Sequence, residues 1–355
     1  MKAIAERELR NYLKRPLFWL GVLIVILGVY REVKPYLMIH YVDSEDEIKE
    51  LVQDSPVTDA DIIDGYVPTK EEDRRQRWEE IIQKALVLEF QIEKTEAEAI
   101  IEEMKDMDVK EASEYLEREY HFYNTFYSYE DTRYHQGTKE EINAYIKSKL
   151  EQRSFSSYFS KKFADFAGLF MGFFATVMLA VLFWQDTRKN TYELLHTKPV
   201  SAGKYVFGKI AGGFLVCMVV LAILNLVFWI ICCIFTGSSG FEVNLIDFLL
   251  ATGLYILPNM LMVVCVYALI SLLFKNPLPA VPLLILYMIY SNMGSRNAEG
   301  IFGYYGRPLA IMVRFPGQFF DTTPPPMAMM NQSFLILASV GVFLLCVWLW
   351  KKRKV

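Results

Sequence analysis

The sequence predicts an all-α membrane protein with six transmembrane helices, cytoplasmic N and C termini and a mostly helical extracytoplasmic domain. Three observations support this fold class. Long apolar segments recur along the chain, and 53% of its residues are hydrophobic. Residues 31–162 interrupt these segments and carry 32 acidic against 19 basic side chains, whereas the rest of the chain carries 9 acidic and 18 basic ones. Helix-start motifs recur within the acidic part, so one acidic domain is inserted into a basic, apolar frame.

A helix that crosses a bilayer needs about 20 apolar residues. The predicted spans cover roughly 17–30, 163–184, 210–235, 248–274, 278–290 and 334–350. The first span resembles a signal peptide, but YREVKP follows it instead of a small-x-small cleavage site, so we expect a retained anchor over 17–31. All five cysteines lie in predicted spans, which predicts a domain at 32–162 without disulfides.

The placement of basic residues predicts the orientation, because cytoplasmic loops are enriched in lysine and arginine. Six spans with both ends inside place four basic clusters on the cytoplasmic side. These are Lys2, Arg7, Arg10, Lys14 and Arg15; Arg188, Lys189, Lys198, Lys204 and Lys209; Lys275; and 351–354. Arg296, Arg307 and Arg314 are exceptions in the outer segment 292–333.

The acidic domain has four S/T-x-x-E patterns typical of capping boxes, which begin at Ser44, Thr69, Thr95 and Thr138. With the intervening Asn, Pro and Gly residues, they predict helices near 44–53, 70–91, 96–106, 110–120 and 138–152.

Two aromatic stretches stand out. YHFYNTFYSYEDTRYH (120–135) contains seven aromatic residues and two histidines. Its function is either a binding platform or a domain core with an interface, and the binding candidates are His121, Phe122, Tyr123, Phe126 and Tyr127. No metal-ligand spacing accompanies the histidines. FSSYFSKKFADF (155–166) has the aromatic and basic composition that settles at a membrane interface.

The connection NTYELLHTKPVSAGKYVFGKI (190–210) is one residue away from a nucleotide-binding P-loop. Gly203, Gly208 and Lys209 fit G-x-x-x-x-G-K-[ST], but Ile210 replaces the hydroxyl that binds Mg²⁺, and no buried strand precedes it. We therefore expect no nucleotide site. TYELLHTK instead predicts a short helix ended by Pro199, which either docks on a soluble partner or is only a basic loop.

At these residues the chain resembles the permease subunits of type-2 ABC transporters. Their connection between spans two and three has an acidic residue, LL, a Lys/Ser-Pro-Val-Ser step and then Gly-Lys. The matching residues are Glu193, Leu194, Leu195, Lys198, Pro199, Val200, Ser201, Gly208 and Lys209. The N-terminal AERELRNYLKRP also matches, as an amphipathic cytoplasmic helix over 1–16. The resemblance covers residues 1–31 and 163–355.

The resemblance implies a coupling loop over 185–209, in which Glu193, Leu194, Leu195, Lys198 and Pro199 contact a separate cytoplasmic ABC ATPase. ATP and Mg²⁺ would bind that partner, so this chain would be no enzyme. A second permease, identical or related, would complete the transporter in the plasma membrane. The insertion at 32–162 is longer than in simple members, and 292–333 resembles their re-entrant element or outer gate.

No charged residue lies near the middle of a predicted span, which argues against an ion-coupled transporter. Thr176, Asn225 and Asn259 are candidates for a substrate path, or else form hydrogen bonds between helices. The cargo favoured by these observations is a peptide, antibiotic or other amphiphile, and a cation remains an alternative. A membrane-anchored sensor is the second functional class. An intramembrane enzyme is disfavoured, because the spans contain no histidine, H-E-x-x-H or G-x-S-x-G motif.

Overall fold

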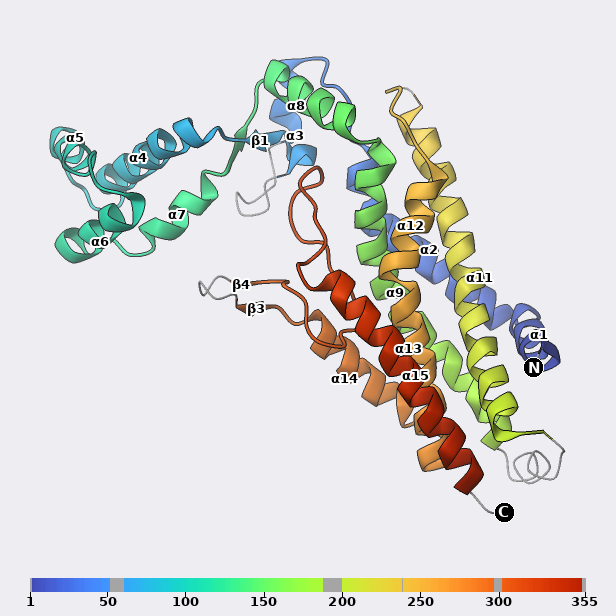
Figure 1. Ribbon diagram of the computed structural model, residues 1–355. Helices are drawn as coiled ribbons and strands as arrows, with labels where there is room; N and C mark the ends of the chain where they lie inside the picture. Colours follow the sequence, from blue (N-terminus) through green and yellow to red (C-terminus); the bar gives the residue numbers. More distant parts are fainter. Residues whose placement is uncertain (1, 52–60, 188–199, 238, 297–301, 353–355) are drawn as a thin grey trace. The chain divides into compact units, whose positions relative to one another are not determined.

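The computed structural model describes residues 2–51, 61–187, 200–237, 239–296 and 302–352 (Figure 1). The chain divides into two compact units, which are described separately here. The membrane unit comprises Met1–Met38 and Leu150–Val355, and the outer unit comprises Ile39–Lys149. The boundaries of 32–162 and 163–355 drawn from the sequence are not tested by this division and stay predictions.

The membrane unit is built of helices. They are α1 (Lys2–Leu13), α2 (Pro16–Leu37), α9 (Phe155–Thr187), α11 (Ala202–Thr236), α12 (Leu245–Tyr255), α13 (Leu257–Phe274), α14 (Ala280–Asn292) and α15 (Ala328–Lys352). Two short strands, β3 (Ser295–Arg296) and β4 (Phe302–Gly303), form an antiparallel pair between α14 and α15.

Five segments in the described residues are long and apolar enough to cross a membrane. They are Pro16–Leu37, Phe155–Ala180, Ala202–Thr236, Leu245–Phe274 and Ala328–Lys352. The apolar helix α14 has only 13 residues, whereas a span needs about 20. The structure therefore agrees with an all-α membrane protein, while a sixth span stays a prediction.

Helix α2 begins at Pro16, because proline lacks the N–H that the first turn leaves unpaired anyway. Apolar side chains at helical spacing, including Phe18, Val22 and Val25, are buried along one stripe. This stripe packs against α9, and two α2 glycines allow the close approach. A methyl group at Gly28 would collide with the ring of Phe170.

The described residues of the outer unit form six helices, a 3₁₀ turn and one small sheet. Its elements are α3 (Glu45–Leu51), the 3₁₀ turn η2 (Ile62–Asp64), β1 (Tyr66–Pro68), α4 (Glu71–Leu88), α5 (Lys94–Glu103), α6 (Val109–Tyr120), α7 (Thr125–Asp131), β2 (Tyr134–Gln136) and α8 (Lys139–Gln152), the last ending in the membrane unit. Strands β1 and β2 are antiparallel, with Val67 opposite His135. The five expected helices are present, and α7 adds a short one within the aromatic stretch.

The predicted helix starts are only partly correct. Thr138 and Glu141 form both bonds of a capping box, at 3.3 and 2.9 Å. Helix α4 begins after Lys70 without a side-chain cap, because the Thr69 hydroxyl contacts His135 instead. Thr95 lies inside α5 rather than at its cap. The capping box of α6 begins at Asp108, a residue outside the S/T pattern.

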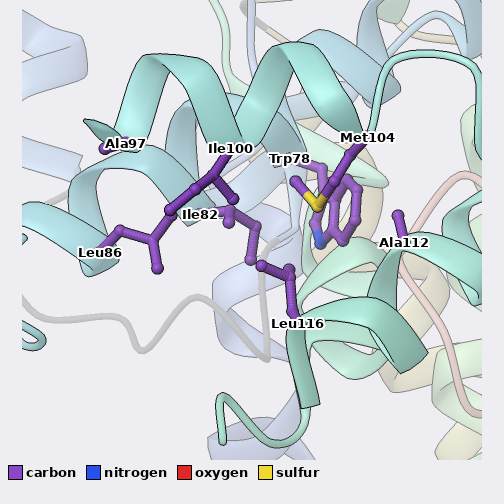
Figure 2. Close-up of a cluster of buried hydrophobic side chains, with 8 residues drawn as sticks. All are labelled: Trp78, Ile82, Leu86, Ala97, Ile100, Met104, Ala112 and Leu116. Carbon is purple, nitrogen blue, oxygen red and sulfur yellow. The ribbon is translucent and has the colours of Figure 1, made fainter. Parts of the chain in front are cut away.

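A hydrophobic core joins α4, α5 and α6 (Figure 2). Its buried members are Trp78, Ile82, Leu86, Ala97, Ile100, Met104, Ala112 and Leu116. Trp78 is fully buried, and its indole N–H donates to the carbonyl of Thr125 at 2.9 Å. Arg75 donates to the carbonyls of Met104 and Met107. Packing and polar contacts thus hold these helices together without a disulfide.

Candidate functional site

The expected coupling residues Glu193, Leu194, Leu195, Lys198 and Pro199 lie outside the described residues. The structure describes what flanks them. Helix α9 ends at Thr187 and α11 begins at Ala202, so the connection joins two of the candidate spans. The last residue of this connection, Ser201, has an extended backbone and is the N-cap of α11.

The near-match to a P-loop does not form a phosphate loop. A P-loop holds phosphate with successive backbone N–H groups before the helix starts. Here Gly203, Gly208 and Lys209 all lie inside α11, where their backbone is helical. Lys209 is also only 4% exposed. These residues therefore form a helix and not a phosphate-binding loop, and the absence of a nucleotide site stays a prediction.

The N-terminal helix α1 packs against the bundle. Tyr12 is 3% exposed, and its hydroxyl donates to the carbonyl of Met178 at 2.6 Å. Met178 lies in α9, and α1 also lies along α11 (Figure 1). Helix α1 is therefore attached to the two helices that the 188–201 connection joins.

Two polar residues of the spans have partners within the helices. Thr176 is buried and donates to the carbonyl of Gly172 at 2.8 Å. The Asn225 amide donates to the carbonyl of Leu221 at 2.8 Å, and its oxygen accepts from Thr252 of α12 at 2.9 Å. The second bond connects α11 to α12, which favours the helix-to-helix alternative for Asn225.

Asn259 lies at the break between α12 and α13. Pro258 has no N–H and interrupts the helix, which breaks at Ile256. The Asn259 amide donates to the carbonyl of Tyr255 at 2.6 Å, so this carbonyl near the break has a hydrogen-bond donor. Its own Oδ1 is buried and has no hydrogen-bond partner among the described residues. The break is thus partly compensated by Asn259 itself.

A buried ion pair at one end of the bundle was not anticipated. Asp165 of α9 is 5% exposed and accepts a hydrogen bond from Nε of Arg314. The same guanidinium donates to Oδ1 of Asn292 at 2.6 Å. The sequence contained one signal for this pair, since Arg314 departs from the distribution of the other basic residues. The spacing of 149 residues conceals its partner.

The two lysines before Asp165 fix the same segment of chain. Lys161 donates to the carbonyl of Thr322 at 2.9 Å. Lys162 is 5% exposed and donates to the carbonyls of Phe315 and Gly317, at 3.3 and 2.5 Å. Because Asp165, Lys161 and Lys162 are on one helix, α9 holds the segment 314–322 by charged groups.

The principal side chains of 155–166 are buried by protein, while the position of this segment at a membrane interface stays a prediction. Phe155 and Phe159 are fully buried, and Phe155 packs on Phe319 with 5.3 Å between ring centroids. These residues form the interior of the membrane unit, because the segment 314–322 folds over them. The aromatic side chains of this segment pack against other side chains of the protein.

The aromatic candidates of the outer unit separate into two groups. Phe122 is partly buried and packs against the α4–α5–α6 core. Its ring also lies on Phe90, with 4.7 Å between ring centroids. Tyr123, Phe126 and Tyr127 are exposed by 57%, 43% and 69%. His121 ends α6 in the left-handed conformation, with φ of 55°. The core and exposed-surface interpretations therefore each apply to part of the stretch.

The family model for ABC-2 family transporter proteins matches residues 2–354. The chain belongs to the ABC-2 transporter family. Searches of curated proteins and of solved structures found no significant match. The match extends over both units, so the outer unit lies within the matched range.

ABC-2 permeases sit in the membrane and work with a cytoplasmic ABC ATPase. They are membrane components of transporters and have no ATPase activity of their own. Membership in the ABC-2 family and the five apolar helical segments establish a multi-pass membrane protein and a permease.

Proposed function

We propose that this chain is the membrane-spanning subunit of an ATP-driven ABC exporter. The observation that carries the proposal is the family match over residues 2–354, which includes the whole connection between α9 and α11. The partner ATPase would bind ATP and Mg²⁺. A second permease, identical or related, would complete the path across the membrane.

In this proposal the 185–209 loop transmits the movement of the ATPase to the membrane helices. Glu193, Leu194, Leu195, Lys198 and Pro199 form the docking element. Helix α11 is continuous from Ala202 to Thr236, so it can carry a displacement of its N-terminal end along its length. ATP then favours one of two arrangements of the permease, because the ATPase binds the two arrangements with different affinity.

The basic clusters support an orientation in which both termini and this loop lie in the cytoplasm and the spans cross the plasma membrane. Export of a peptide, antibiotic or other amphiphile follows from the apolar character of the spans. Among the three polar candidates, Asn259 is the best placed to contact cargo, because its buried Oδ1 has no hydrogen-bond partner in the described chain. Thr176 and Asn225 are weaker candidates.

The segment 292–333 would act as the outer gate in this transporter. Its attachment to α9 through Arg314 and the carbonyls near Gly317 supports this role, since a gate must follow the helix that moves it. A gate of this kind changes between two discrete packed arrangements rather than deforming continuously.

The proposal is tested by purifying the chain in mild detergent from its native membrane and identifying the proteins that accompany it. A stoichiometric ATPase with its own P-loop is expected, and Glu193→Ala should reduce its retention or cargo-stimulated ATP turnover. Glu242→Ala is the matched control, because Glu242 is exposed beyond the other end of α11. A chain purified alone, or with a partner that is no ATPase, would favour the membrane-anchored sensor.

A further inference from the structure

The outer unit contains a cavity of about 330 Å³ that is separate from its aromatic surface. This volume lies within the range of about 300–1,000 Å³ that is typical of small-molecule sites. Strand β1, strand β2, the start of α4 and the start of α8 form its walls. The polar lining residues are Lys70, Asp73, Arg77, His135, Glu141 and Tyr145.

One wall of the cavity is a row of charges on α4. Lys70 caps this helix, and Asp73 and Arg77 follow at spacings of three and four, which places all three on one side of it. In the described chain, their side chains form no hydrogen bond or ion pair with protein groups. The row has two cations and one carboxylate, so its net charge is positive.

The part of the lining that α8 supplies carries a negative charge. Glu141 on α8 accepts a hydrogen bond from the backbone N–H of Thr138 at 2.9 Å. This bond and nearby His135 lower the pKa of the Glu141 carboxyl, so it is ionised at neutral pH. One of its oxygens is thereby fixed by α8, while the carboxylate borders the cavity.

His135 is fixed between the two walls. Its Nδ1 lies 3.0 Å from the Thr69 hydroxyl, and its Nε2 lies 3.7 Å from Glu141. The second distance is too long for a hydrogen bond. The His135 side chain is only 13% exposed, and burial lowers its pKa, which favours the neutral ring. Burial and the contact with Thr69 hold this ring in place in the lining of the cavity.

We propose that this cavity binds a small zwitterion that carries both a free ammonium and a free carboxylate, such as an amino acid or a short unblocked peptide. The carboxylate would face Lys70 and Arg77, and the ammonium would face Glu141. Charge-assisted hydrogen bonds at both ends fix the orientation of such a ligand. Val67 and Pro68 of β1 supply apolar surface between the ends.

The site is independent of the proposed export function, because all its residues belong to the outer unit. It also differs from the aromatic candidates His121 to Tyr127, none of which lines this cavity. Its charges are spread over residues 70–141, and the pairing of β1 with β2 brings them together.

The test is isothermal titration calorimetry with the full chain in detergent micelles. The probes are trialanine, N-acetyl-trialanine, trialanine amide and the doubly blocked N-acetyl-trialanine amide. Trialanine should bind most tightly. Each singly blocked peptide should bind about tenfold or more weakly, the effect expected for losing one charge-assisted hydrogen bond.

Two variants assign the ends of the ligand. The double variant Lys70→Gln with Arg77→Gln should abolish the preference for trialanine over trialanine amide, and Glu141→Gln should abolish the preference over N-acetyl-trialanine. Glutamine can still accept the hydrogen bond from Thr138, so α8 keeps its cap, and circular dichroism checks the helix content. Arg118→Gln is the control, because Arg118 is exposed on α6 and pairs with Glu119.

Three results would overturn the proposal. The first is no heat of binding for trialanine at millimolar concentration. The second is equal affinity for N-acetyl-trialanine, which would indicate a simple anion site, or for trialanine amide, which would indicate a cation site. The third is a preference that persists in the double variant Lys70→Gln with Arg77→Gln and in Glu141→Gln, and so arises elsewhere on the chain.

Discussion

Replacing Asp165 by asparagine should destabilise the membrane unit, because it leaves the buried Lys162 and the partly buried Arg314 without a carboxylate. Asp165 pairs with Arg314. Buried Lys162 lies about one helical turn before Asp165 on α9. Removing one partner of a buried pair costs about 3–5 kcal/mol. The Arg314 side chain is 21% exposed and keeps its bond to Asn292, so we expect about 3 kcal/mol, at the lower end.

The cysteines provide an assay that reports on the membrane unit alone. Four of the five are buried in α11, α13 and α15, and residues 39–149 contain none. Buried thiols react slowly with a thiol-reactive dye until the helices separate. Unfolding by titration with sodium dodecyl sulfate, followed by dye labelling, therefore gives the difference in unfolding free energy between variants.

A double-variant cycle separates the ion pair from the loss of a carboxylate. Asp165→Asn with Arg314→Gln should be less destabilised than the sum of the single variants, since the loss of Asp165 then no longer leaves the Arg314 charge without its partner. Glu242→Gln, an exposed substitution in the same unit, should stay within about 0.5 kcal/mol of the parent. The reasoning is refuted if Asp165→Asn is as stable as this control, or if the two single effects simply add.

Three further outcomes are expected. Trp78→Ala should cost the outer unit about 3–5 kcal/mol, because the indole is fully buried, and native-state proteolysis of the full chain should show faster cleavage. Burial lowers the pKa of His135 below 6.5, so the folded unit prefers the neutral ring. The contribution of His135 to stability is complete above about pH 6.5 and is lost as the pH falls below that value, and His135→Gln should flatten this fall in pH-dependent melting. Gly28→Ala should destabilise the membrane unit by about 1–3 kcal/mol in the dye assay, because the methyl group meets Phe170. Gly253→Ala, with open space at its Cβ, should not destabilise it.

The local features of the fold could be predicted from the sequence. Apolar length marks the five spanning segments, because a helix in lipid must satisfy its backbone hydrogen bonds within itself. Glycine, proline and capping residues mark the outer helices to within a few residues. The fifth predicted span is the exception, since α14 has 13 residues and apolar composition alone does not determine where a helix ends.

The candidate sites could be predicted only where their residues are contiguous. The 185–209 loop and the aromatic stretch 120–135 are single segments, so their composition was visible. The caps at Thr69 and Thr95 were wrong because S/T-x-x-E is a local pattern, and a tertiary contact with His135 diverts the Thr69 hydroxyl.

The sequence by itself determined that apolar helices cross a membrane around an acidic, cysteine-free domain, because hydrophobic length, charge and capping act over a few residues. Only the tertiary structure decided which distant groups meet. It pairs Asp165 with Arg314, directs Lys161 and Lys162 to backbone carbonyls, and brings Arg77 and Glu141 into the lining of one cavity. For Asp165 and Lys162, which are 5% exposed, the cost of burying a charge selects the partners, and that cost depends on the packed environment rather than on neighbours in the chain.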